Sequence, residues 1–170
     1  MLKENDSLVQ VKICGLTSMD DVHIIEKYGA DYAGMVLYYP KSRRNIDINL
    51  AAVLVAQLKK SDIKSVAVVE EDIYLETKRW RSLDKIYGLL FDAGVPGSGK
   101  TFDWESLKKA DCGNKKLFLA GGLTPDNVKA AIEAVRSDVV DISSGVEYDD
   151  VSVKGKDESK VKAFIQNAKF

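Results

Sequence analysis

Residues 86–92 read Ile86-Tyr87-Gly88-Leu89-Leu90-Phe91-Asp92, an apolar run that ends in a carboxylate. A glycine-rich segment follows directly, Ala93-Gly94-Val95-Pro96-Gly97-Ser98-Gly99-Lys100. A short apolar run bounded by glycine and proline indicates a buried β-strand. Proteins with α/β folds place ligand sites in the loops that follow such strands. Because a buried acid is costly without a partner or a use, Asp92 is the first candidate for a functional side chain.

Strands and helices are expected to alternate along the rest of the chain. Further apolar strands are predicted at residues 9–15, 32–39, 65–69, 116–120 and 139–145. Helices are predicted at about 18–28, 48–60, 72–83, 104–110, 125–135 and 158–168, with Thr17 or Ser18 capping the first and Thr124 capping the fifth. Near-continuous apolar strands that alternate with helices predict a parallel sheet covered by helices. An open doubly wound sheet and a barrel both fit this order.

The ends of the predicted strands favour the barrel. They carry Cys14-Gly15, Asp92, Gly121-Gly122 and Ser143-Ser144-Gly145. In barrels the working residues lie at the carboxyl ends of the strands. The segment after the first strand also lacks the Gly-x-Gly-x-x-Gly pattern of dinucleotide-binding folds. We therefore expect an α/β, TIM-barrel-like (β/α) barrel of about six parallel units, in one domain over residues 1–170.

Composition limits the classes of function. The chain has 170 residues and a net charge of -1, so no basic surface indicates binding to nucleic acid or an acidic membrane. Residues 1–7 lack the apolar core of a signal peptide and no run is long enough to span a membrane, so the cytoplasm is expected. Cys14 and Cys112 are too few for a disulfide framework, and with His23 as the only histidine, expected at the surface, no metal site is expected.

Cys14 and Asp92 are the candidate catalytic residues. A thiol acts as a base when it is partly ionised, and Lys12, on the same face of the strand, could lower its pKa. The alternative is a buried structural cysteine. Asp92 could be a general acid if burial raises its pKa, or it could cap a loop. Facing each other across a barrel mouth, the two would suit proton transfers beside a carbonyl or imine.

The remaining candidates are binding residues. Gly121, Gly122, Ser143, Ser144 and Gly145 follow the last two strands, where barrels of this class bind phosphate. Tight-turn glycines and helix-capping serines are the alternative. Arg43 and Arg44 could hold a carboxylate through paired hydrogen bonds, or could belong to a solvated basic loop.

Five motifs in order resemble the phosphoribosylanthranilate isomerase family of tryptophan biosynthesis, over residues 9–69 and 86–170. They are residues 12–17, 40–46, 90–92 with 96–104, 119–128, and 140–147 with 155–157. The resemblance implies a (β/α)8 barrel that needs no cofactor. It also implies an isomerase that performs the Amadori rearrangement of N-(5-phosphoribosyl)anthranilate to 1-(2-carboxyphenylamino)-1-deoxyribulose 5-phosphate.

The same resemblance implies a role for each matched residue. Asp92 would be the general acid that protonates the ribose ring oxygen, and Cys14 the general base that removes the C2 proton from the iminium. Arg44 would hold the anthranilate carboxylate, and Asp141 would lie near the ribose. The phosphate group would bind at Gly122, Ser143, Ser144 and Gly145.

The chain departs from the family in length. The family has eight strand–helix units, whereas six are predicted here, with the omission between Val69 and Tyr87. The six units could close as a smaller barrel, or open strand edges could be covered by a second copy. We expect a homodimer that binds a small phosphosugar and neither nucleic acid nor a membrane. A non-catalytic phosphosugar-binding subunit is the main alternative. Cys14 argues against a third option, the related aminoaldose isomerase of histidine biosynthesis, because that barrel has an aspartate in this place.

Overall fold

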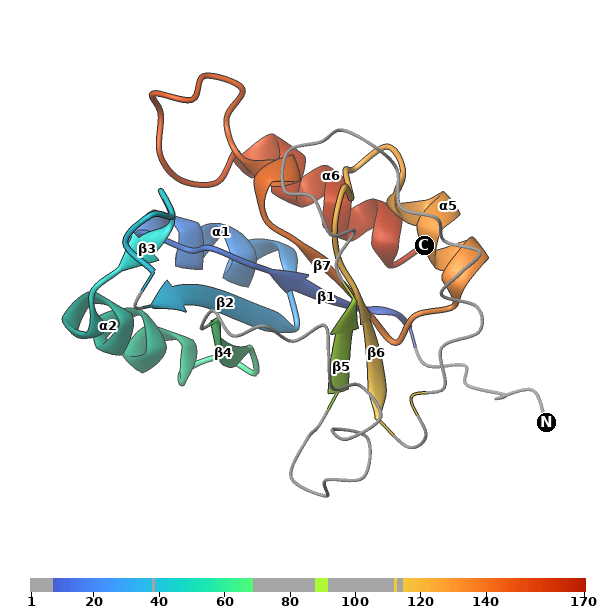
Figure 1. Cartoon of the computed structure of the whole chain (residues 1–170), viewed down its shortest axis with the longest axis horizontal. Coiled ribbons are helices and arrows are strands. Elements are labelled where there is room, and N and C mark those ends of the chain that lie inside the picture. The colour runs from blue at the N-terminus through green and yellow to red at the C-terminus, as the bar shows by residue number, and fades with distance from the viewer. Residues whose placement is uncertain (1–7, 38, 69–87, 92–111, 113–114) are drawn as a thin grey trace.

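The computed structural model describes residues 8–37, 39–68, 88–91, 112 and 115–170. Its strands are β1 (Gln10–Ile13), β2 (Tyr32–Leu37), β3 (Asn45–Ile46), β4 (Lys64–Val68), β5 (Gly88–Phe91), β6 (Lys116–Leu119) and β7 (Val139–Ile142). Its helices are α1 (Met19–Tyr28), α2 (Ile48–Leu58), α5 (Val128–Val135), the 3₁₀ turn η2 (Ser144–Val146) and α6 (Glu158–Ala168) (Figure 1). Every ladder between these strands is parallel, as the apolar strand pattern predicted.

The order of the strands is that of a barrel. The sheet runs β3-β2-β1-β7-β6-β5, and β4 pairs with β2. Lys12 of β1 lies opposite Tyr32 of β2 on one side and Asp141 of β7 on the other. The last strand therefore closes against the first, as it does in a barrel, and the open doubly wound alternative is excluded.

A contact between two rings shows that the sheet is curled. Tyr32 on β2 and Phe118 on β6 have ring centroids 5.6 Å apart in an edge-to-face arrangement. Strands β1 and β7 lie between β2 and β6, so a flat sheet would separate the two positions by roughly 14 Å. The curl brings them together on the inner face, where Val139 completes a small apolar cluster.

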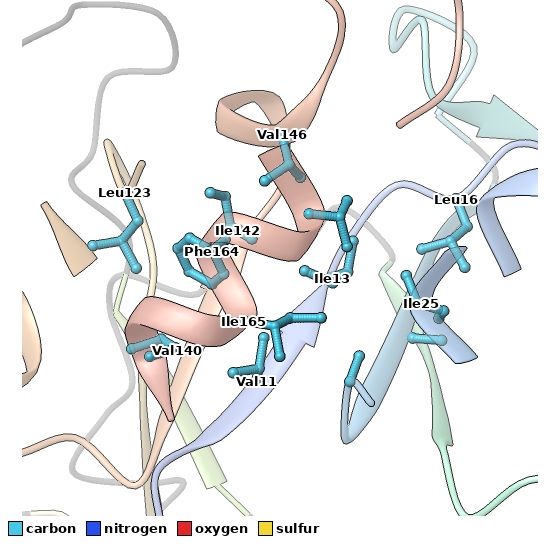
Figure 2. Packing of buried hydrophobic residues seen from close by; sticks show 14 of the residues in the cluster. Val11, Ile13, Leu16, Ile25, Leu123, Val140, Ile142, Val146, Phe164 and Ile165 are labelled. Atoms are coloured by element: carbon cyan, nitrogen blue, oxygen red, sulfur yellow. The ribbon is translucent and has the colours of Figure 1, made fainter. Parts of the chain in front are cut away.

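Helices cover the outer face of the sheet. Side chains alternate along a strand, so Val11, Ile13, Val140 and Ile142 point away from the inner face and into the main apolar core. Figure 2 shows Phe164 and Ile165 of α6 beside these strand residues. Helix α6 also contacts α1 and α5, so the three form a continuous outer layer (Figure 1).

Local signals in the sequence explain where α1 begins and ends. The Ser18 side chain accepts a hydrogen bond from the Asp21 backbone N–H, which makes Ser18 the N-cap. Gly29 ends the helix in the left-handed conformation, with φ 75°, which costs a residue without a Cβ little. His23 is exposed, as the helical periodicity predicted.

Two elements differ from the sequence prediction. Residues 45–46 form the short strand β3 within a segment expected to be a loop. Helix α5 begins at Val128, so Pro125 lies in the turn before the helix and not in its first turn. In that turn Thr124 N–H donates to the Asn127 side chain at 2.8 Å, and Asn127 N–H donates to Thr124 Oγ1 at 3.3 Å. This reciprocal pair satisfies the turn without extending the helix.

Among the described strands, β4 and β5 lie at edges of the sheet. No ladder joins β4 to β5, the two strands on either side of the expected omission. The prediction of a TIM-barrel-like sheet reduced to about six units is confirmed, and β3 is an addition to it. The helices predicted at 72–83 and 104–110 lie outside the described residues, and the single domain over 1–170 stays a prediction. Within the described part of the chain, no helix is both long and apolar enough to cross a membrane.

Phe164 is fully buried in the layer between α6 and the sheet, so its truncation tests this packing. We expect Phe164→Ala to lower the free energy of unfolding by about 3–5 kcal/mol, because it leaves a cavity in the core. Urea unfolding followed by circular dichroism measures the change. Phe170, which is 57% exposed, is the matched control, and Phe170→Ala should cost less than about 1 kcal/mol. Equal losses in the two variants would contradict the described packing.

Candidate active site

A buried ion pair lies on the inner face where β7 meets β1. Lys12 Nζ is 2.7 Å from Asp141 Oδ2, and their side chains are 3% and 8% exposed. Burial by itself lowers the pKa of Lys12, but the negative charge of Asp141 and the hydrogen bond to it raise that pKa above the ordinary value. Lys12 is therefore a cation at neutral pH, and it joins the first and last strands of the sheet.

Cys14 lies directly after β1, two residues beyond Lys12 of this ion pair. Its backbone N–H donates to Ile142 O at 2.8 Å, and its carbonyl accepts a hydrogen bond from Ser143 Oγ at 3.1 Å. Gly34 of β2 leaves room for the thiol, because a Cβ at that position would lie 2.7 Å from Cys14 Sγ. The thiol is thus held where three strands meet, at the carboxyl end of the sheet.

The ionisation of Cys14 differs from the sequence expectation. Burial raises the pKa of the Cys14 thiol, and the negative charge of Asp141 adds to this. Lys12 acts in the predicted direction, and Lys156 assists it, but together they do not offset the burial. Lys12 thus lowers the pKa of the thiol as predicted, but burial and Asp141 outweigh it, so the pKa lies above the ordinary value.

Lys156 is a second buried lysine that sequence reasoning missed. Its Nζ donates to Ser143 O at 3.2 Å and to Glu147 Oε1 at 3.3 Å, and its side chain is fully buried. Burial lowers the pKa of Lys156, and the negative charge of Glu147 opposes that shift. The one signal available in the sequence was its place in the last matched motif, next to Gly155.

Arg44 and Glu147 pair across the mouth of the site. Arg44 donates from Nε to Glu147 Oε1 and from Nη2 to Glu147 Oε2, the latter at 3.2 Å. The Arg44 side chain passes over Gly15, where a Cβ would lie 2.5 Å from Arg44 Cδ. Arg44, which was predicted to bind a substrate carboxylate, thus binds the carboxylate of Glu147 in this structure. Arg43 is exposed and donates to Val153 O, which fits the solvated-loop alternative for that residue.

The five candidate phosphate-binding residues lie on two loops that touch. Gly121 and Gly122 follow β6 with φ of 84° and 65°, a conformation that glycine adopts without strain. Ser144 and Gly145 are in η2, after β7. A Cβ on Gly145 would lie 2.3 Å from Leu123 O, so only glycine permits this approach of the loops. Gly122 and Ser144 are exposed at the surface of the two loops.

Asp92, the proposed acid, lies outside the described residues. Strand β5 ends at Phe91, whose carbonyl accepts a hydrogen bond from Ala120 N–H at 2.9 Å. The carboxyl end of β5 therefore lies beside the loop that follows β6. The position of the Asp92 carboxyl relative to Cys14 stays a prediction.

Comparison with known proteins identifies the family. The family model described as N-(5'-phosphoribosyl)anthranilate (PRA) isomerase matches residues 49–167. The chain belongs to the phosphoribosylanthranilate isomerase family. The isomerase of Aquifex aeolicus is 35% identical over 207 residues, which cover 95% of this chain and 99% of that relative. Because 207 aligned positions exceed the 170 residues here, part of the relative has no counterpart in this chain.

Solved structures of phosphoribosylanthranilate isomerases have the same fold. Monomers generated from the dimeric isomerase of Thermotoga maritima match with a TM-score of 0.71 and 29% identity, over 95% of this chain and 99% of that one. An isomerase in complex with reduced 1-(o-carboxyphenylamino)-1-deoxyribulose 5-phosphate matches with a TM-score of 0.72 and 30% identity, over the same shares. The resemblance read from the five motifs is confirmed.

A direct titration tests the raised pKa of Cys14. In a Cys112→Ser background, ultraviolet absorbance of the thiolate should report Cys14 alone. We expect its midpoint to lie above that of a free cysteine peptide measured alongside, because burial disfavours the charged form. Lys12→Met should raise the midpoint further, whereas Lys27→Met, which changes an exposed lysine, should leave it unchanged. A midpoint below that of the free peptide would contradict the assignment.

Proposed function

We propose that this protein is a phosphoribosylanthranilate isomerase, which converts N-(5-phosphoribosyl)anthranilate to 1-(2-carboxyphenylamino)-1-deoxyribulose 5-phosphate. One observation carries the proposal beyond family membership. Cys14 lies at the junction of β1, β2 and β7, within the fields of Lys12 and Lys156 and beside the loops proposed to bind phosphate. This places a potential base, cations and glycine loops at one end of the sheet, where barrel enzymes work.

Cys14 acts as the general base. Asp92 protonates the ribose ring oxygen, the ring opens, and an iminium forms between C1 and the anthranilate nitrogen. Cys14 then takes the C2 proton, and the resulting enolamine tautomerises to the ketose product. Because burial raises the pKa of Cys14, the thiol must first release its own proton to solvent, and the nearby positive iminium favours that ionisation. Lys12 and Lys156 also lower the pKa of the Cys14 thiol.

The binding groups follow from the same geometry. Arg44 holds the anthranilate carboxylate, since a guanidinium presents paired donors that match a carboxylate. Backbone N–H groups and hydroxyls of the two touching loops hold the phosphate, with Gly121 and Gly122 on one loop and Ser143, Ser144 and Gly145 on the other. Asp141, held by Lys12 at 2.7 Å, lies on the inner face below them and is the acid near the ribose.

Turnover of phosphoribosylanthranilate by the purified protein, followed as loss of its fluorescence, is the decisive assay. Cys14→Ser and Asp92→Asn should each lower kcat by about 10²-fold or more, because each removes a group that moves a proton. Cys112→Ser is the matched control and should retain activity. Growth of a tryptophan auxotroph that lacks the isomerase provides an independent readout. If the wild-type protein binds the reduced product analogue without turnover, the non-catalytic phosphosugar-binding alternative is correct.

We also propose that the protein works as a homodimer in the cytoplasm. Strands β4 and β5 are edges of the described sheet, and exposed edges favour pairing with another chain. The structural relative from Thermotoga maritima is described as dimeric. Cys14 and Cys112 are free thiols, as expected where the environment is reducing.

The homodimer is tested by sedimentation at micromolar concentrations, where we expect twice the mass of one chain. Leu90, on the edge strand β5, is 41% exposed, and Leu90→Lys should shift the equilibrium toward monomer by placing charge at the proposed contact. Leu8 is 67% exposed and lies outside both edge strands, so Leu8→Lys is the control and should leave the mass unchanged. A wild-type protein that is monomeric throughout and fully active would contradict the proposal.

A further inference from the structure

Glu147 is a buried charged residue that the proposed rearrangement does not use, and it lies beside Lys156. Glu147 is 8% exposed and Lys156 is 1% exposed. They pair with each other through a 3.3 Å contact and through an isolated antiparallel bridge between their backbones. Buried charges are costly unless they are paired, and a retained pair beside a candidate site calls for a role there.

The geometry of Arg44 suggests that role. A guanidinium carries five N–H donors in a rigid plane. Glu147 accepts from Nε and from Nη2, which is one edge of the plane. Three donors remain, two on Nη1 and one on Nη2. One Nη1 donor and the remaining Nη2 donor form the second edge, which can hold another carboxylate through two parallel hydrogen bonds. Glu147 therefore fixes the plane of Arg44 while leaving its outer edge to a ligand.

Glu147 is itself held on the barrel by a chain of contacts. Lys156 Nζ donates to Glu147, and Lys156 backbone N–H donates to Asp21 Oδ1 at 2.7 Å. Asp21 is buried in the first turn of α1, where its other oxygen accepts from Thr17 N–H at 2.7 Å. Gly155 has a φ of 106°, and a Cβ there would lie 3.0 Å from Asp21 Oδ1. The long loop after η2 (Figure 1) is thus held to α1 by the contact between Lys156 and Asp21, close to Glu147.

The charges of this cluster favour a second anion. Burial by itself raises the pKa of Glu147, but the hydrogen bond from Arg44 and the charges of Lys156 and Arg44 lower it below the ordinary value. Glu147 is therefore ionised at neutral pH. Arg44 is a cation at any physiological pH, so its remaining N–H donors can attract a further carboxylate.

We propose that Glu147, fixed by Lys156, is a positioning residue that orients Arg44 so that its Nη1–Nη2 edge binds the carboxylate of the aromatic substrate. Glu147 thereby sets specificity for a carboxylated arylamine over an arylamine without the carboxyl group. This inference rests on the function proposed above. If Glu147 instead competes with the substrate for Arg44, its removal should tighten binding of the carboxylated ligand.

The test compares two ligands in wild-type protein and in Glu147→Gln. One is reduced 1-(o-carboxyphenylamino)-1-deoxyribulose 5-phosphate, and the other is the same compound without the carboxyl group. We expect Glu147→Gln to weaken calorimetric binding of the first about tenfold or more, the scale of a hydrogen bond between charged groups, and to leave the second unchanged. In turnover, KM for phosphoribosylanthranilate should rise by a similar factor while kcat changes by less than about threefold.

Matched variants keep the result interpretable. Glu158→Gln removes an exposed carboxylate that pairs with Lys27 and should change neither ligand's binding. Glu147→Asp retains the charge on a side chain one methylene shorter, and should also weaken the carboxylated ligand selectively. It serves as the second variant if Glu147→Gln fails to fold, which thermal unfolding reveals.

Two outcomes overturn the inference. Equal weakening of both ligands indicates a merely structural role, and tighter binding of the carboxylated ligand indicates competition for Arg44. Failure of the proposed function is distinguishable, because binding is measured without turnover. If wild-type protein binds the carboxylated ligand more tightly but does not turn over substrate, the isomerase activity is refuted. The role of Glu147 in ligand binding is then still supported by the comparison of variants.

Discussion

The buried ion pair between Lys12 and Asp141 is the interaction on which the rest of the structure depends. It joins residues 129 positions apart, on the first and last strands of the sheet. Removing one partner of such a pair leaves an uncompensated charge and typically costs about 3–5 kcal/mol. The pair therefore keeps β1 against β7, and Cys14 and Ser143 lie directly beyond that contact. The same two charges act on the thiol in opposite directions.

The site combines alternating charges with little exposed surface. Lys12, Asp141, Lys156 and Glu147 are all buried, and each has at least one opposite charge within hydrogen-bond distance. Burial and Asp141 raise the pKa of Cys14 in this arrangement, while Lys12 and Lys156 act in the opposite direction. In the proposed reaction, burial limits ionisation of the thiol and the two lysines favour it.

The reduced barrel retains the strands that carry the site. Cys14, Gly34, Gly122 and Ser143 follow or belong to β1, β2, β6 and β7, which are consecutive in the sheet. The edges β4 and β5 flank this group, one at each end, and Asp92 follows β5 in the sequence. The curl that brings β2 toward β6 is stabilised by Tyr32 and Phe118 on the inner face, so it does not require a complete ring of strands. A shorter chain of this family can therefore keep its chemistry on the retained side.

The sequence alone determined the parallel α/β architecture, because apolar runs such as Tyr32–Leu37 and caps such as Ser18 are local signals. The matched motifs likewise named Cys14, Arg44 and the glycine loops. Only tertiary structure decided β3, which exists because Asn45 and Ile46 find partners on β2. It also decided the pairing of Arg44 with Glu147, 103 residues apart, and the raised pKa of Cys14. Burial and long-range charge depend on which strands and loops meet, and no local pattern in the chain encodes that.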